Sequence, residues 1–208
     1  RKKIYKINNN EYTPYKLAFS PNGKKLAVAW WDDNNNHQEL SLYNVVDLLN
    51  KSDEKKIIKK NNNEEERRKK NIESIAFSPK NGDKLAIGYL DSSKIDIYDI
   101  GKKTTTTFDI IKHEKKPKEV NKYNESELQN YKTWNYRGET YEVKNVKINS
   151  IAFSPNGDKL AVGAELNYKK NTQTRKFIQG RIMIFDINSK ELVHTHIPTH
   201  MDYPEKRV

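Results

Sequence analysis

Cysteine is absent from the 208-residue sequence. Its absence excludes disulfides and thiolate metal sites and favours a reducing compartment, so we expect a cytoplasmic protein. No apolar run approaches about 18 residues, and no segment is therefore expected to cross a membrane as a helix. The sequence opens RKKIYKI, without methionine or an apolar signal core. We expect the chain to be a segment of a longer polypeptide.

Catalytic motifs are also missing. The sequence contains no phosphate-cradling glycine-rich loop, no nucleophile elbow and no metalloprotease motif. His194 and His196 share one face of an expected strand, with His200 nearby, but zinc would need further ligands. We interpret these histidines as exposed polar positions. We therefore expect a protein that is not an enzyme, with no catalytic residue, no metal and no cofactor.

Basic residues outnumber acidic residues by 39 to 28, which gives a net charge of +11. A basic surface suits nucleic acid, anionic lipid or an acidic protein partner. Aromatic residues interleaved with the basic ones would favour stacking on bases, but the first basic run has none. We interpret the charge as solvated loops, with RNA binding as the alternative. The candidate nucleic-acid contacts are Arg67, Arg68, Lys69, Lys70, Lys169, Lys170, Arg175 and Lys176, and Lys112 to Lys118 form a further basic run.

One stretch occurs three times in the sequence. The copies are YKLAFSPNGKKLAVA at 15–29, ESIAFSPKNGDKLAIG at 73–88 and NSIAFSPNGDKLAVG at 149–163. Each copy has two short apolar runs around a Ser-Pro and Asn-Gly turn. Proline presets φ and Asn-Gly readily adopts positive φ, so each copy predicts a β-hairpin. Recurrence of one supersecondary unit is typical of a repeat architecture.

Two further strands are expected after each hairpin. The third strand alternates and ends in an aromatic residue followed by Asp or Asn, as in LSLYN (40–44), KIDIYDI (94–100) and RIMIFDI (181–187). The fourth is expected in KKIIKK (55–60), TTTTFDII (104–111) and ELVHTHI (191–197). A four-stranded antiparallel unit of this kind makes one propeller blade. We therefore predict an all-β β-propeller with blades at about 13–60, 72–111 and 147–197.

The repeats resemble those of the WD-repeat β-propeller family. The resemblance is carried by Ala18 to Pro21, Ala76 to Pro79, Ala152 to Pro155, Tyr43-Asn44, Tyr98-Asp99 and Phe185-Asp186. It covers about half of the chain and implies a non-enzymatic scaffold that mediates protein–protein interaction. Tyr or Phe replaces the tryptophan of the family's name-giving dipeptide, and no Gly-His pair precedes a blade. We therefore expect the blades to rely on apolar packing rather than on the family's buried polar network.

Long insertions separate the repeats. Phe19, Phe77 and Phe153 are 58 and 76 residues apart, against a family period of about 40–45. We expect these three rings to be buried equivalently, and the surplus residues to form insertions at about 45–71, 112–146 and 165–180. The sequence runs NNNEEERRKK in the first insertion and is rich in Lys, Asn, Thr and Gln in the third.

Three blades and a leading strand at 3–7 do not close a ring, because closed propellers have four to eight blades. We expect the remaining blades to come from a longer polypeptide. The alternatives are a second chain that completes the ring, or a degenerate fourth blade hidden in 112–146.

Aromatic residues mark a candidate partner surface. Trp30 and Tyr89 occupy equivalent positions at the end of the second strand, and Trp31 follows. In WD-repeat relatives, residues near this rim contact partners, and Trp and Tyr are enriched at binding hot spots generally. We predict that the surface consists of Trp30, Trp31, Tyr89, Tyr131, Trp134 and Tyr136. Capping of the core or packing on a neighbouring blade is the alternative for each.

Acidic residues also follow the second strand of each repeat, at Asp32, Asp33, Asp91 and Glu165. Catalytic carboxylates would need to face each other across a cleft. Turn formation requires only hydrogen bonds to the local backbone. We interpret these residues as turn formers.

Overall fold

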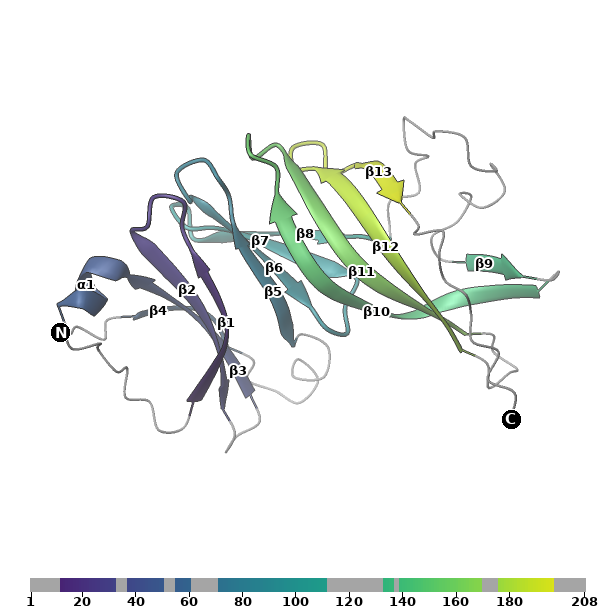
Figure 1. Cartoon of the computed structure of the whole chain (residues 1–208), viewed down its shortest axis with the longest axis horizontal. Helices are drawn as coiled ribbons and strands as arrows, with labels where there is room; N and C mark the ends of the chain where they lie inside the picture. Colours follow the sequence, from purple (N-terminus) through teal and green to yellow (C-terminus); the bar gives the residue numbers. More distant parts are fainter. Residues whose placement is uncertain are drawn as a thin grey trace, which may run out of the picture.

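The computed structural model describes residues 12–32, 37–50, 55–60, 71–111, 133–136, 139–169 and 176–196. These residues form three antiparallel sheets that follow one another along the molecule (Figure 1). Strands that are consecutive in sequence are neighbours within each sheet, so every sheet is a meander. The expected all-β fold built from four-stranded propeller blades is confirmed, and the blades form an open arc.

The strand bounds are as follows. The first sheet contains β1 (Tyr12–Phe19), β2 (Lys25–Asp32), β3 (His37–Asn44) and β4 (Lys55–Lys60), with α1 (Val45–Leu49) after β3. The second contains β5 (Ile72–Phe77), β6 (Lys84–Tyr89), β7 (Lys94–Asp99) and β8 (Thr104–Asp109). The third contains β9 (Thr133–Tyr136), β10 (Glu139–Phe153), β11 (Lys159–Lys169), β12 (Lys176–Asp186) and β13 (Leu192–His196).

A serine holds each repeated hairpin turn together. Ser20 Oγ accepts a hydrogen bond from the backbone N–H of Lys25 at 2.9 Å and donates one to Asn22 Oδ1 at 2.8 Å. Ser154 makes the equivalent pair of bonds in the third copy. In the second copy Gly82 has a φ of +60°, and a Cβ there would lie 2.8 Å from Ser20 Cβ. The turn glycine therefore supplies a left-handed backbone and a close approach to the preceding blade.

The second sheet packs through both of its faces. The front face of a sheet points towards the preceding sheet, and the rear face points towards the following one. The front face of the second sheet contributes Phe77, Leu85, Ile87 and Tyr89 to a core shared with the rear face of the first. Its rear face contributes Ala86, Ile95, Ile97 and Phe108 to a core shared with the third sheet. Successive strand residues point to opposite faces, so the alternation in sequence builds two cores at once.

The anchor phenylalanines are not buried equivalently, which corrects the sequence expectation. Phe77 is 9% exposed, and Phe153 is half-buried against the core between the second and third sheets. Phe19 is 63% exposed. The reason is positional: all three rings lie on front faces, and within the described residues no sheet precedes the first.

The third blade is larger than expected. Residues 165–180 were predicted to form an insertion, but β11 and β12 continue through most of this stretch as a paired ribbon, from Leu160–Phe185 to Lys169–Lys176. Leu166 and Tyr168 are buried on one face of this ribbon. Their period of two is that of a strand, and it outweighed the polar composition on which the prediction relied.

The expected insertion at 112–146 also contains strands. β9 pairs with the start of β10, from Glu139–Tyr136 to Glu142–Thr133, and so adds a fifth strand to the third sheet. These strands belong to the third sheet and not to a fourth blade. Residues 112–132 and the expected leading strand at 3–7 lie outside the described residues. In the expected insertion at 45–71, α1 and β4 are described.

Candidate functional site

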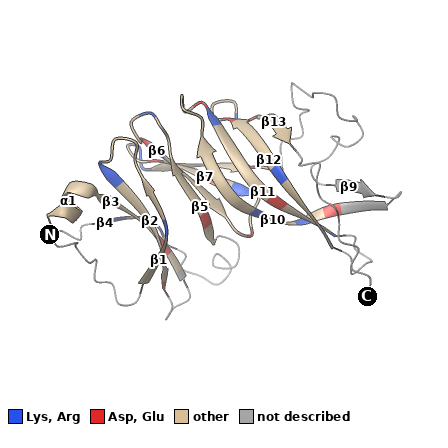
Figure 2. Cartoon of the chain, viewed as in Figure 1, with Lys and Arg blue, Asp and Glu red and all other residues tan. Residues whose placement is uncertain are grey.

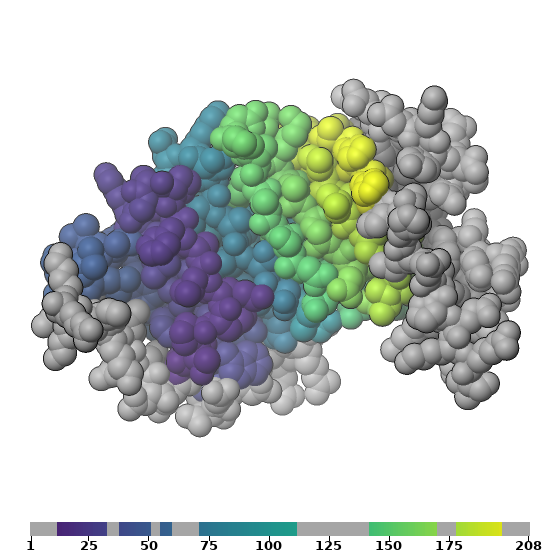
Figure 3. All heavy atoms as spheres, in the orientation of Figure 1, coloured from purple at the N-terminus to yellow at the C-terminus, as the bar shows by residue number. Residues whose placement is uncertain are grey.

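The front face of the first sheet carries exposed apolar side chains. Leu17 and Phe19 on β1 lie opposite Val28 and Leu26 on β2, and both β1 residues are more than half exposed. Val28 is buried nearby with Trp30 and Tyr43, and Leu48 of α1 packs against this cluster. The first described sheet therefore ends in an apolar face that is covered at its centre and exposed along β1. In the space-filling view of Figure 3, the purple N-terminal strands lie at the surface of the molecule.

The rear face of the third sheet is the counterpart at the other end of the arc. Ile182 is 47% exposed there, and Ile178 is exposed farther along β12. The equivalent residue in the second sheet is Ile95, which is fully buried beneath the third sheet. The same motif position is thus covered at an inner junction and exposed at the end of the arc.

These two end faces have the chemistry of the inner junctions. At each of the two junctions within the arc, a front face meets a rear face, and the same motif positions make both contacts. The front face around Phe19 and the rear face around Ile182 are therefore complementary surfaces of the same kind. Each is suited to packing against another blade.

A partly buried polar cluster crosses the junction between the first and second sheets. The Tyr89 hydroxyl donates a hydrogen bond to Asp96 Oδ2 at 2.6 Å, and Lys59 Nζ donates to the same oxygen at 2.9 Å. Thr107 Oγ1 donates to Asp96 Oδ1 at 2.7 Å. Lys59 also donates to the Tyr89 hydroxyl, and its ammonium lies 4.3 Å from the centre of the Tyr89 ring. Lys59 of the first sheet is thus tied to two residues of the second.

Burial and hydrogen bonding set the ionisation of this cluster. Burial disfavours the charged form of Asp96, yet the hydrogen bond from Tyr89 and the charge and hydrogen bond of Lys59 together hold the pKa of the Asp96 carboxyl below its ordinary value. Burial, followed by the Asp96 charge, raises the pKa of the Tyr89 hydroxyl far above its ordinary value. Tyr89 is therefore a neutral donor and not a phenolate nucleophile. The cluster is a polar clamp between blades.

Removing the Asp96 carboxylate should destabilise the fold and change its acid sensitivity. We expect Asp96→Ala to lower the free energy of unfolding by about 2–3 kcal/mol at neutral pH, because it leaves the half-buried Lys59 ammonium without this carboxylate. A carboxyl whose folded pKa is depressed stabilises the fold above its unfolded pKa of about 3.9, and this stabilisation is lost as the pH falls through the folded value. The difference between wild type and variant should therefore shrink below about pH 4.

Urea unfolding at a series of pH values measures this difference. Asp109→Ala is a suitable control. Asp109 accepts hydrogen bonds from Ser93 and from its own loop, and it forms no ion pair with a described residue of a neighbouring blade. A difference between wild type and Asp96→Ala that stays constant down to pH 2 would contradict the ionised clamp.

Two of the predicted partner-binding aromatics are core residues. Trp30 is 4% exposed and Tyr89 is 1% exposed, so their expected exposed placement on the rim is wrong. Trp30 lies on the front face of the first sheet and is covered by the cluster that contains Tyr43 and Leu48. Tyr89 lies on the front face of the second sheet and is covered by the first sheet. Trp31 is half-buried, and its role in partner binding stays a prediction. Tyr131 lies outside the described residues, and the structure describes only the backbone of Trp134 and Tyr136, in β9.

The predicted basic contacts are described in part. Lys169 and Lys176 are cross-strand neighbours at the end of the β11–β12 ribbon. Arg67, Arg68, Lys69, Lys70, Lys170 and Arg175 lie outside the described residues, as do Lys112 to Lys118. Figure 2 shows Lys and Arg scattered over the described sheets, with acidic residues between them. Nucleic-acid contact by these residues stays a prediction.

The two described histidines of the expected His-x-His pair lie on the outer strand β13. His194 and His196 lie on β13 opposite Ile184 and Ile182, and His200 is outside the described residues. No group of three or more potential metal ligands occurs among the described residues.

Asp91 accepts a hydrogen bond from Asn145 at 2.8 Å, which links the second and third sheets. Asp32 is the buried last residue of β2, and Asp33 lies outside the described residues. Glu165 lies within β11 and accepts from Asn149, so its interpretation as a turn former is wrong. β11 simply runs past the point where the equivalent strand of the second sheet ends.

The Lys59–Asp96–Tyr89 clamp was missed in the sequence, although a signal for it exists. Asp96 alternates with Ile95 and Ile97 in KIDIYD, so its side chain points to the opposite face of the same strand. In a sheet covered on both faces, a carboxylate at such a position needs a buried partner. The partner, Lys59, comes from a different blade, and its identity depends on how the sheets pack.

No helix in the described part of the chain has the length and apolarity needed to cross a membrane. No protein-family model matches the sequence, and no curated protein matches it.

Several solved structures are similar to the chain, and β-propeller domains are among them. The β-propeller domain of the Trilobed protease from Pyrococcus furiosus, described as having an open velcro topology, matches 89% of this chain over 43% of its own length, with 12% identity and a TM-score of 0.48. An acylaminoacyl peptidase from Pyrococcus horikoshii matches 90% over 25% of its length, with 9% identity and a TM-score of 0.48. The Cps50 (Swd1) β-propeller domain of Myceliophteria thermophila matches 88% over 72%, with 10% identity and a TM-score of 0.36. The chain spans less than half of the length of the first two.

Proposed function

We propose that the chain is a non-enzymatic, WD-repeat-like β-propeller scaffold that mediates protein–protein interaction and packs through its two end faces against further blades. One observation carries this proposal. Phe19 is 63% exposed, while Phe77 at the same motif position is 9% exposed beneath a neighbouring sheet. Burying an aromatic side chain stabilises an interface by about 1.5–3 kcal/mol. An end face with this pattern therefore favours association with a blade.

The WD-repeat part of the proposal is supported by the three Ala-Phe-Ser-Pro hairpins and the aromatic-Asp or aromatic-Asn pairs. The non-enzymatic part is supported by the lack of a recognisable catalytic motif in the sequence. One fold can host many unrelated functions, so fold alone does not decide function. A cytoplasmic location stays a prediction from the lack of cysteine.

Self-association tests the end faces, because the front face of one copy is complementary to the rear face of another. Such head-to-tail contacts give rings or open chains of copies. We expect the purified chain to associate as its concentration rises, measured by sedimentation velocity. Phe19→Lys and Ile182→Lys should each weaken association at least about tenfold, since a charge would be buried against an apolar face.

Thr105→Lys is the matched control, because Thr105 is exposed on the outer strand β8 and should not affect association. Association that Phe19→Lys and Ile182→Lys leave unchanged would overturn the proposed role of the end faces. A monomer at all concentrations would do the same.

RNA binding stays the alternative prediction, supported by the net charge of +11. The slope of log K against log salt for a single-stranded RNA measures it, because each neutralised phosphate contributes about 0.7 to the slope.

A further inference from the structure

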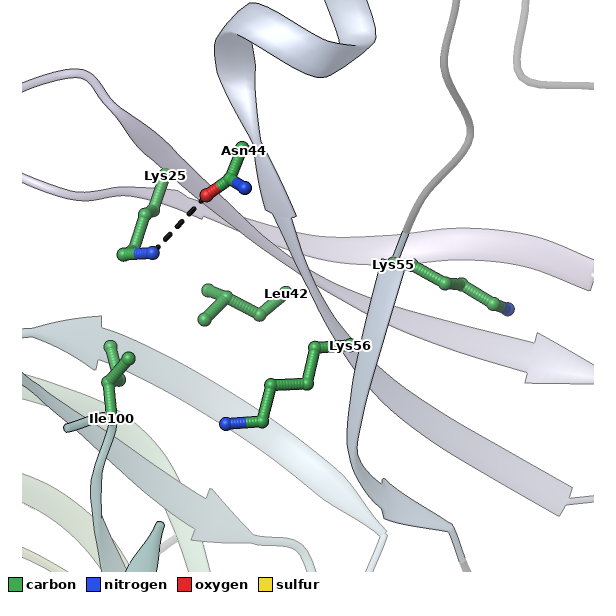
Figure 4. Close-up of a pocket in the computed structure, with 6 residues that line it drawn as sticks. All are labelled: Lys25, Leu42, Asn44, Lys55, Lys56 and Ile100. Carbon is green, nitrogen blue, oxygen red and sulfur yellow. Dashed lines mark hydrogen bonds between the residues drawn. The ribbon is translucent and has the colours of Figure 1, made fainter. Parts of the chain in front are cut away.

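A hollow lies between the first and second sheets, at the end of the strands where the Ser-Pro-Asn-Gly turns lie. Its volume is about 340 Å³, and its lining consists of Lys25, Leu42, Asn44, Lys55, Lys56 and Ile100 (Figure 4). This volume is near the lower end of the range of ligand sites, so the hollow suits one or two side chains and not a large cofactor. It is well away from the Trp30 and Tyr89 end of the strands.

The lysines of the hollow differ in their partners. Lys55 Nζ pairs with the buried Glu39 at 2.6 Å, and Figure 4 shows this side chain directed away from the other two. Lys25 Nζ donates to the neutral Asn44 Oδ1 at 3.3 Å, which is its one side-chain hydrogen bond to the described residues. Lys56 Nζ lies 5.4 Å from the centre of the Tyr98 ring. Among the described residues, neither Lys25 nor Lys56 has a carboxylate within ion-pair distance.

Apolar side chains complete the hollow. Leu42 is buried and lies between the Lys25 and Lys56 side chains, and Ile100 of the second sheet is half-buried opposite (Figure 4). A ligand that satisfies both parts of this lining has an anionic head and a short aliphatic stem. Glutamate and aspartate side chains have that form.

The same lining disfavours nucleic acid. Single-stranded nucleic acid binds by stacking its bases on exposed aromatic rings. Tyr98 is the aromatic ring beside the hollow, but it is buried, and the Lys56 ammonium lies over it. A phosphate would be attracted by the two ammonium groups but would not use Leu42 and Ile100.

We propose that this hollow is a docking site for an acidic segment of a protein partner. A carboxylate of the segment receives charge-assisted hydrogen bonds from Lys25 and Lys56, and its stem packs on Leu42 and Ile100. The inference deepens the proposed scaffold function by naming the chemistry of a partner. It does not depend on the end faces, because both sheets that form the hollow belong to the described arc.

Binding of a fluorescein-labelled hexaglutamate peptide tests the site, measured by fluorescence anisotropy with the full chain at low ionic strength. We expect Lys25→Gln and Lys56→Gln together to weaken binding at least about tenfold, because both charged donors are lost. Lys25→Arg with Lys56→Arg should retain binding within about threefold, since the charge remains. Ile100→Ser should weaken binding through loss of the apolar contact with the stem.

The matched control is Lys94→Gln with Lys102→Gln, which removes the same charge from two exposed lysines outside the hollow. It should change binding less than about twofold, because solvent screens exposed charges. If the control variant lost as much peptide affinity as the Lys25→Gln and Lys56→Gln variant, the net charge of the chain would explain binding and the proposal would be overturned. Tighter binding of a labelled oligouridylate, sensitive to Lys25→Gln and Lys56→Gln, would overturn it in favour of nucleic acid.

Failure of the hollow and failure of the end faces are separable. Phe19→Lys and Ile182→Lys should each weaken self-association at least about tenfold and leave hexaglutamate binding unchanged. Unchanged melting temperatures of the lysine variants ensure that a loss of binding reports the hollow and not unfolding. Peptide binding that disappears with Phe19→Lys would contradict a site formed within the arc.

Discussion

Replacing Phe77 by alanine should lower the free energy of unfolding by about 3–5 kcal/mol, because the substitution leaves a cavity in the core between the first and second sheets. The same substitution at Phe19 should change it by no more than about 0.5 kcal/mol, because most of that ring is already in solvent. The two residues occupy the same motif position. The contrast therefore measures the presence of a neighbouring sheet and nothing intrinsic to the hairpin.

Urea unfolding of dilute protein measures both values. Dilution matters because association through the end faces would stabilise the fold by mass action and add a contribution from Phe19. At concentrations where copies associate, the Phe19→Ala variant should melt at a lower temperature than the wild type, because it loses part of the stabilisation from association. Equal destabilisation by the two substitutions in dilute monomer would mean that Phe19 is covered and that the arc does not end at the first sheet.

Gly88→Ala should lower the free energy of unfolding by about 1–3 kcal/mol, the usual range for overpacking. A Cβ at this position would lie 2.6 Å from Ile148 Cγ2 and 2.6 Å from Ile151 Cδ1, so both side chains of the third sheet would have to move. Because the conflict is with specific methyl groups, Ile151→Val combined with Gly88→Ala should recover part of the loss. The two substitutions should therefore be non-additive.

Gly163→Ala is the control for this prediction, since Gly163 occupies the equivalent position in the third sheet. The nearest atom to a Cβ there is Ser150 Cβ, at 3.7 Å, which is an ordinary contact. Alanine also restricts the unfolded chain more than glycine, so Gly163→Ala should stabilise the fold by about 0.4–1 kcal/mol. Destabilisation of the two variants to the same extent would contradict the close approach of the second and third sheets at Gly88.

The sequence by itself determined the repeating unit. Ser-Pro-Asn-Gly turns, period-two apolar runs and aromatic-Asp endings act over a few residues, so they could be interpreted without knowledge of the packing. The structure has hairpins at all three copies, each followed by the third and fourth strands. Hydrogen bonds within the turn explain why a local pattern suffices. The Ser20 hydroxyl donates to the Asn22 side chain and accepts from the backbone N–H of Lys25.

For the extension of the third blade, the sequence contained two conflicting local signals. Leu166 and Tyr168 alternate as strand residues do, yet the polar composition around them favoured an insertion in the sequence interpretation. The paired β11–β12 ribbon shows that the alternation was the better guide. Composition reports average solvent exposure, whereas alternation reports which face of a strand is covered.

Tertiary structure alone decided which motif positions are buried and which surfaces are available. Phe19 and Phe77, Ile182 and Ile95, and Gly163 and Gly88 are local equivalents with different surroundings. The hollow at Lys25 and Lys56 and the clamp at Lys59 and Asp96 likewise join residues from two sheets. Local sequence fixes the direction in which a strand side chain points, but burial depends on the sheet that it meets, and in an open arc that sheet is present at inner junctions and lacking at the described ends.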